Sequence, residues 1–341
     1  MRLGKRFWCS LSLLALLHVG ALFAGVAAPY DPTVQDRDAS FVPPTKIHFR
    51  DPGGTLHLRP WVYGVEINDD GDYSEDLQHQ FRLRLLVEGA PYKLFGILPS
   101  TRHLFGVDAG GKIFLMGTDL YGRDQFSRLV YGAQISLFAG LLATILSLSL
   151  GAIIGTIAGF FGGWMDEGLM RLAELLLALP WLYLLFAVRA FLPLSVNPTT
   201  TFILVVAIIG FVGWVRPARL VRGIVLSAKE RRYVLAARGF GASDFYLLRR
   251  HIFPQTYSVL LTQATLLIPQ FILAEVTLSF LGLGVAEPVP SWGNMLSSLQ
   301  QYHVIVSYWW MFMPGIALVG VFLSYFSLAD ALEKHVKSAS V

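Results

Sequence analysis

The sequence has little cysteine and little charge. Cys9 is the only cysteine in the 341 residues, which excludes an intramolecular disulfide and a cysteine metal cluster. Charged residues make up 15% of the chain and hydrophobic residues 54%, whereas about 25% charged residues is usual in soluble domains. The mean hydropathy of +0.55 agrees with these proportions. Such a chain is suited to a lipid bilayer rather than to water.

Motifs for catalysis and nucleotide binding are also missing. The apolar segments contain no His-Glu zinc motif and no nucleophile elbow. Gly106, Gly111 and Lys112 match part of the Walker A spacing, but Ile113 stands where a serine or threonine must hold magnesium. The acidic stretch 66–76 lacks the closing glutamate of a calcium loop, which favours a solvated turn. The sequence therefore predicts no catalytic residue, no metal site and no bound cofactor.

Six apolar runs approach or exceed the roughly 20 helical residues that cross a hydrocarbon core about 30 Å thick. They cover approximately residues 7–28, 135–161, 172–194, 200–215, 257–283 and 307–329. The predicted fold is an all-α integral membrane protein with six transmembrane helices. The first run follows basic residues and ends in small ones, so it also fits a cleavable signal peptide, whose removal would leave five spans.

The distribution of basic residues predicts the orientation of these spans. The segment between the fourth and fifth runs carries Arg216, Arg219, Arg222, Lys229, Arg231, Arg232, Arg238, Arg249 and Arg250. Lysine and arginine are absent from 195–199 and 284–306. The positive-inside rule places the arginine-rich segment and both termini in the cytoplasm. The net charge of +4 thus reports membrane topology, and no nucleic-acid partner is expected.

Composition divides the chain into four segments. They are an N-terminal transmembrane helix at 1–29, a polar extracytoplasmic insert at 30–124, a five-helix core at 125–330 and a cytoplasmic tail at 331–341. Strand-forming residues at 57–63, 81–87 and 112–115 predict a small β-rich domain within the insert.

The cytoplasmic segment 221–254 is too long for a simple connection. It mixes helix formers with arginines, which predicts short helices on the membrane surface. Ala236 and Ala237 provide a small-residue face, and Gly241 permits a sharp turn that a side chain would obstruct. Pro254 then begins the fifth span.

This order of residues resembles the EAA coupling loop of permease subunits in ABC importers. The positions concerned are Tyr233, Ala236, Ala237, Gly241, Ala242, Ser243, Ile252 and Pro254. The resemblance implies that short helices here dock in a groove of a separate ATP-binding subunit and transmit its closure to the spans. Leu235 stands where the family usually has glutamate, so an ion pair of roughly 0–1 kcal/mol is replaced by apolar surface.

Further motifs resemble the peptide-permease branch of that family. The first comprises Gly117, Thr118, Asp119, Gly122, Arg123, Asp124, Ser127 and Arg128. Others run over 166–180 and over 274–295, the latter including Glu275, Gly282 and Gly284. Asp119 or Asp124 fits a helix cap, with substrate contact as the alternative. Glu275 either faces the pore or the partner permease, or hydrogen-bonds a neighbouring helix; the two glycines serve bending or packing.

The resemblance covers roughly residues 115–330 and implies the second permease of a peptide-type ABC importer in a bacterial inner membrane. Its implied partners are a second homologous permease, two ATP-binding subunits or one fused ATPase that bind ATP and magnesium, and an extracytoplasmic substrate-binding protein. Short peptides are the expected substrate, although related members carry nickel chelates, sugars and modified peptides. The alternative function is a secondary transporter or channel without an ATPase. The insert either recognises the binding protein or acts as a spacer.

Overall fold

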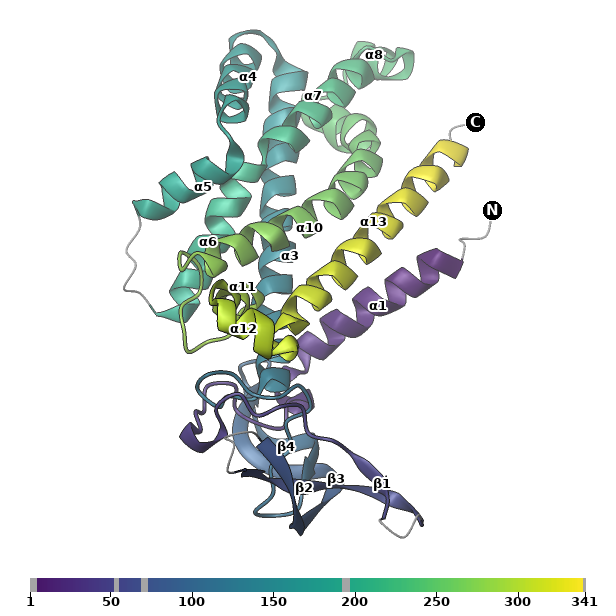
Figure 1. Cartoon of the computed structure of the whole chain (residues 1–341). Helices are drawn as coiled ribbons and strands as arrows, with labels where there is room; N and C mark the ends of the chain where they lie inside the picture. Colours follow the sequence, from purple (N-terminus) through teal and green to yellow (C-terminus); the bar gives the residue numbers. More distant parts are fainter. Residues whose placement is uncertain (1–4, 52–54, 69–72, 192–196, 340–341) are drawn as a thin grey trace. The chain divides into compact units, whose positions relative to one another are not determined.

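The computed structural model describes residues 5–51, 55–68, 73–191 and 197–339 (Figure 1). The chain forms two compact units. Unit 1 comprises Met1–Leu14, Phe138–Leu278 and Gly320–Val341, and unit 2 comprises Ala15–Leu137 and Ser279–Val319. Parts of three predictions lie outside the described residues: the aspartates of 69–72, the end of the third apolar run at 192–194, and both chain ends.

Unit 1 is helical. Its elements are α3 (Gln125–Phe161), α4 (Gly163–Ala178), α5 (Trp181–Ala190), α6 (Pro198–Gly213), α7 (Val215–Lys229), α8 (Arg232–Gly239), α9 (Asp244–Leu247), a π-turn (Leu248–Ile252), a 3-10 turn (Phe253–Thr256) and α10 (Tyr257–Phe280). α1 (Lys5–Leu22), α3, α10 and α13 (Met313–Ala339) continue into unit 2. The local signals are ordinary ones: the Asn197 side chain accepts a 2.8 Å hydrogen bond from Thr200 N, and Pro198 occupies the first turn of α6.

Three glycines of α3 at four-residue spacing bring α7 against it. A Cβ at Gly155 would lie 2.4 Å from the carbonyl oxygen of Ala218, and one at Gly159 would lie 2.9 Å from that of Arg222. At Gly151 the Cβ would lie 2.6 Å from Pro217. Small residues at this spacing allow helix backbones to approach closely in a membrane. The α3–α7 pair is therefore fixed by backbone proximity.

Among the described residues, four helical stretches are long and apolar enough to cross a membrane: Gln125–Phe161, Pro198–Lys229, Asp244–Phe280 and Trp309–Ala331. The third predicted span is not one straight helix, because α4 and α5 meet at 94°. Leu179 leaves the helical region with ψ 136° ahead of Pro180, as expected for a residue before proline. The third predicted run thus falls on a bent helix pair rather than on a single helix. Counting the bent pair as one span gives five, and Phe7–Leu22 is a shorter apolar helix.

Unit 2 contains a four-stranded antiparallel sheet in the order β1-β2-β3-β4. The strands are β1 (His48–Arg50), β2 (Leu56–Ile67), β3 (Tyr73–Leu94) and β4 (Leu98–Val107). The long β3 pairs with β2 along its first half and with β4 along its second. Residues 112–115 do not form a strand, contrary to prediction. Phe114 instead exchanges hydrogen bonds with Thr45, since its N–H donates to Thr45 Oγ1 at 2.9 Å.

The sheet segment and residues 279–319 share a core within unit 2. The remaining elements are α2 (Ala24–Ala27), a 3-10 turn (Arg37–Ala39), α11 (Trp292–Ser297), α12 (Tyr302–Ser307) and two short turns (Ser298–Gln300, Trp309–Phe312). The rings of Phe41 and Tyr308 stack 3.9 Å apart. Trp310 Nε1 donates to the carbonyl oxygen of Thr118 at 2.9 Å. Phe41 thus forms one apolar cluster with Val304, Trp310 and Met311.

Candidate functional site

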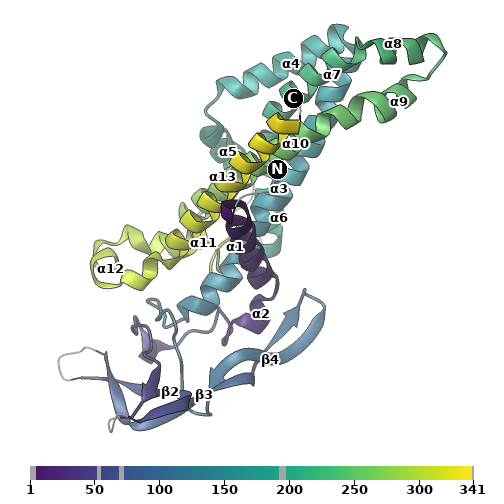
Figure 2. The ribbon, with the colours of Figure 1, turned by 90° about the vertical axis from the view of Figure 1, so that its right-hand side faces the viewer.

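The segment after α7 packs one of its faces on the ends of α3 and α7 (Figures 1 and 2). Its inward side chains are Val234, Leu247 and Ile252, all buried. They join Phe160, Val221, Val225 and Ala228 in one core cluster, with Ala237 and Ala242 at its edge. Lys229 Nζ donates to the carbonyl oxygen of Gly159 at 3.0 Å, where the last turn of α3 leaves carbonyls free. This core holds α8 and α9 against the helices that precede them.

The turn between α8 and α9 depends on Gly241. Its φ is +86°, and nothing lies within 4 Å of the position a Cβ would take. The need for glycine is therefore conformational rather than steric. Ser243 caps α9 by accepting a 3.3 Å hydrogen bond from Tyr246 N, and Arg238 reaches Asp244 across the turn at 3.4 Å.

The opposite face of the same segment exposes large apolar side chains. Phe240 is 93% exposed and Phe245 70%. Tyr233, Leu235 and Tyr246 are also exposed, as are the smaller Ala236, Ser243 and Pro254. The predicted coupling residues thus fall into two groups, since Ile252 belongs to the core and the others lie at or near the surface. An exposed apolar patch rimmed by arginines indicates an interaction surface.

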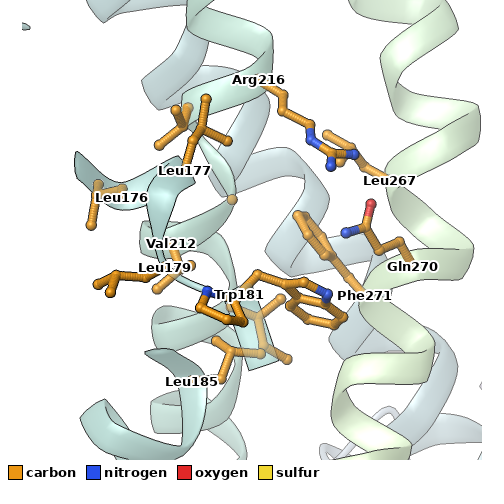
Figure 3. Close-up of a pocket in the computed structure, with 14 residues that line it drawn as sticks. Leu176, Leu177, Leu179, Trp181, Leu185, Val212, Arg216, Leu267, Gln270 and Phe271 are labelled. Carbon is orange, nitrogen blue, oxygen red and sulfur yellow. The ribbon is translucent and has the colours of Figure 1, made fainter. Parts of the chain in front are cut away.

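A pocket of about 240 Å³ in unit 1 lies between the α4–α5 bend, the α6–α7 junction and α10 (Figure 3). Its walls are apolar, with Trp181 and Phe271 among them, while Arg216 and Gln270 point into its upper side. A second pocket of about 550 Å³ shares both polar residues and adds Arg219 and Gln263. Of the residues that the structure describes, no carboxylate pairs with either arginine. Two cations in an apolar groove suit an anionic group.

A cluster of four charged side chains lies in unit 2. Arg123 Nε contacts Asp119 Oδ2 at 2.7 Å, and Arg123 Nη1 contacts Glu287 Oε2 at 2.5 Å. Arg128 Nη2 contacts Glu287 Oε1 at 2.9 Å and Arg128 Nε lies 3.7 Å from Asp119. Both arginines and Asp119 are buried, so removing either sign of charge leaves an uncompensated charge.

The two aspartates of this motif have different roles. Asp124 caps α3, because its Oδ2 accepts a 2.7 Å hydrogen bond from Ser127 N. Burial raises the pKa of Asp124 to about 6, against the lowering effect of its hydrogen bonds with Ser127. Asp119 is no cap: its Oδ1 accepts from the backbone N–H groups of Tyr121 and Arg123 and shapes the loop.

The small residues of the motif hold this loop close to other segments. Thr118 Oγ1 accepts from Val42 N at 2.7 Å and donates to Ala39 O. Ser127 Oγ accepts from Tyr30 N at 3.2 Å. Gly117 and Gly122 have φ of +67° and +71°, and a Cβ on Gly122 would lie 1.8 Å from the carbonyl oxygen of Asp36. Each position of the motif thus has a packing reason.

The structure gives Glu275, Gly282 and Gly284, from the 274–295 motif, three different local roles. Glu275 is completely buried within α10. Gly282 has φ +74° with open space around its Cβ position, so it serves the turn after α10. At Gly284 a Cβ would lie 2.0 Å from Ser279 Oγ, so packing requires its small size.

The sequence model of the family described as "Binding-protein-dependent transport system inner membrane component" matches residues 151–338. The chain belongs to this family. The dipeptide transport system permease protein DppC of Bacillus subtilis (strain 168) is 38% identical over 218 residues, which are 64% of this chain and 66% of its own length. The oligopeptide transport system permease protein OppC of the same organism is 38% identical over 247 residues, 70% of this chain and 77% of its own.

A subunit of the inward-facing MetNI methionine ABC transporter superposes with a TM-score of 0.45 at 16% identity, covering 61% of this chain and 96% of that one. As a member of the family named above, the present chain is a multi-pass membrane component of a binding-protein-dependent transport system.

Two ion-pair partners could not be predicted from the sequence of this permease. Glu287 completes the charge cluster from a position 164 residues after Arg123, and its only signal in the sequence is its place within the 274–295 motif. Arg222 holds Asp166 through two hydrogen bonds, whereas its position in the sequence indicates only the membrane topology. Both depend on contacts between distant segments.

Proposed function

We propose that this chain is the second permease subunit of an ABC importer for di- or oligopeptides. In this proposal ATP is hydrolysed by separate subunits, either two ATP-binding proteins or one fused ATPase, and a second homologous permease completes the pore. An extracytoplasmic binding protein delivers the substrate. The names of the dipeptide and oligopeptide permease relatives support the substrate class.

The observation that carries this proposal is that the segment after α7, residues 230–254, has one buried and one exposed face; we call it the coupling segment. Its inner face is locked into the core with Phe160 and Val225, while Phe240 and Phe245 project outward on either side of the Gly241 turn. A rigid segment with exposed aromatic anchors is suited to a hydrophobic groove on a partner protein. Movement of that partner is passed to α3 and α7 because Val234, Leu247 and Ile252 pack on them.

The proposed topology has six membrane crossings. They are Phe7–Leu22, Gln125–Phe161, the bent α4–α5 pair, Pro198–Lys229, Asp244–Phe280 and Trp309–Ala331. The arginines of residues 230–254 support a cytoplasmic location for this segment, and with six crossings both termini lie on the same side. The sheet-containing insert between the first two crossings is then extracytoplasmic.

We place part of the substrate route at the pocket of Figure 3. A peptide at neutral pH ends in a carboxylate, and the guanidinium of Arg216 is suited to bind it. Gln270 and Gln263 lie seven residues apart on α10 and line the same groove. Their amides offer hydrogen bonds to peptide groups without adding charge.

The experiment is copurification from native membranes in mild detergent, followed by reconstitution with the copurified subunits. We expect a Walker-motif ATPase and a second permease to accompany this chain, and peptide uptake to require ATP and the binding protein. Recovery of the chain alone, with uptake driven by an ion gradient and indifferent to ATP, would assign it to secondary transporters or channels instead.

A further inference from the structure

The tip of the β3–β4 hairpin is apolar and exposed. Phe95 is 50% exposed, Ile97 79% and Leu98 57%. The tip reads Leu-Phe-Gly-Ile-Leu-Pro over 94–99, and its first flanking charges on either side are the exposed basic residues Lys93 and Arg102. A water-facing hairpin normally has polar turn residues. This tip therefore requires an apolar surrounding that the described residues of unit 2 do not supply.

Phe95 also has an unfavourable backbone conformation. Its φ is +53°, followed by Gly96 at +73°. A bulky residue at positive φ is uncommon and costs free energy, whereas glycine or asparagine would fit at no cost. The phenylalanine side chain thus does not stabilise the turn conformation. Its ring instead contacts Phe23.

The hairpin is fixed against the chain that leaves α1. The rings of Phe95 and Phe23 lie 5.4 Å apart, immediately after α1 ends at Leu22. The Tyr92 ring packs so closely on Gly25 that a Cβ there would lie 2.2 Å from it. Figure 2 shows the hairpin reaching past α2 along the end of α1.

His103 strengthens the same attachment. Its Nδ1 lies 2.6 Å from the carbonyl oxygen of Ala28, and its Nε2 lies 2.9 Å from that of Ala90. The ring is buried. The tip is therefore held at the level of the end of α1.

If α1 is the first membrane crossing, that level coincides with the edge of the hydrocarbon core. α1 has 18 residues, which at 1.5 Å each give a length of about 27 Å, slightly less than the roughly 30 Å of the hydrocarbon core. If α1 crosses the bilayer, Phe23 lies at its boundary, and so does the Phe95 ring that touches it. Aromatic side chains are enriched at this boundary, and basic side chains beside it reach the phosphates.

We propose that residues 94–99 insert into the outer boundary of the lipid bilayer, with Lys93 and Arg102 at the headgroups. The hairpin then anchors the insert to the membrane beside α1. This inference rests on the proposed function in one respect, namely that α1 is the first membrane crossing.

The test uses the full transporter complex in liposomes with Cys9→Ser as background. A single cysteine at Ile97, Leu58 or Leu16 is labelled with an environment-sensitive fluorophore. Leu58 is the matched control, because it is 95% exposed on β2 of the same sheet, and Leu16 reports α1. Quenching is measured with spin-labelled phospholipid and with aqueous iodide.

We expect the Ile97 and Leu16 labels to emit at shorter wavelength and to be quenched by the spin-labelled lipid, and the Leu58 label to be quenched by iodide. If the Leu16 label is quenched by spin-labelled lipid but the Ile97 label is quenched by iodide, as the Leu58 label is, the hairpin inference fails while the first crossing stands. If the Leu16 label is not quenched by lipid, the proposed topology itself fails. A change at Ile97 only when binding protein is added would identify a protein partner and overturn the lipid assignment.

Discussion

Arg222 on α7 clamps Asp166 at the start of α4, with Nη2 and Oδ2 2.6 Å apart and Nε and Oδ1 2.5 Å apart. The pair ties α4 to the helix that also carries the coupling-segment core. Such a bidentate arrangement fixes both distance and orientation, which a single hydrogen bond does not.

Asp166→Asn is expected to destabilise the protein by about 1–2 kcal/mol, since the pair is charge-assisted but its arginine is partly exposed. Thermal unfolding of the purified complex measures this. Glu167→Gln is the control, because its contact with Arg171 is 3.7 Å long and both side chains are more than 70% exposed. Equal effects of the two changes would contradict the clamp.

Gly241→Val is expected to strain the turn by about 1–2 kcal/mol, because a residue with a side chain disfavours the left-handed conformation. The cost falls on the coupling segment, so the ATPase subunit should be recovered in lower yield and uptake should fall. Gly239→Ala, a change inside α8 with open space at its Cβ position, should leave both unchanged. Normal ATPase recovery with Gly241→Val would refute the docking role.

Arg128→Gln removes a cation that is 1% exposed and contacts Glu287. The loss is expected to be about 1.5–3 kcal/mol, the size of a hydrogen bond to a charged group, because the Glu287 side chain is 45% exposed and keeps its contact with Arg123. The exposed Arg59 serves as the control, and Arg59→Gln should change the unfolding temperature little. A loss below that of the control would show that the cluster contributes nothing to stability.

Asp124 predicts a pH dependence of stability. Its pKa in the folded protein, about 6, lies above the ordinary 3.8, so the folded state binds the proton more tightly than the unfolded state. The stabilising effect of the protonated form is complete below pH 3.8 and is lost as the pH rises through about 6. Asp124→Asn keeps the capping oxygen, so its unfolding temperature should vary less over this interval. Identical pH profiles would rule out the assignment.

Arg216→Gln is expected to lower uptake of a peptide with a free C-terminal carboxylate about tenfold or more, since a charge-assisted hydrogen bond contributes about 1.5–3 kcal/mol. Arg216→Lys should retain part of the activity. For a peptide amidated at its C-terminus the effect should largely disappear. A loss of the same size for both peptides would indicate a structural role for Arg216 instead of carboxylate binding.

The local features of the fold could be predicted from the amino-acid sequence, because each depends on neighbouring residues. Long apolar runs indicate a membrane protein, and four of them correspond to helices long and apolar enough to span. Gly241 turns the chain between two short helices as predicted, and of the two aspartates that fitted a helix cap the structure selects Asp124. These are consequences of hydrophobicity, capping and backbone freedom, which act over a few residues.

Contacts between residues that are distant in the sequence could not be predicted and depend on how the helices and strands pack. The partner of Arg123 is 164 residues away, and no periodicity predicts that contact. The division of 230–254 into a buried and an exposed face depends on the position of α3 and α7, which the close approach at Gly155 sets. Likewise Phe114 pairs with Thr45 rather than forming a strand. Where local sequence leaves two backbone conformations nearly equal in free energy, tertiary packing determines which one forms.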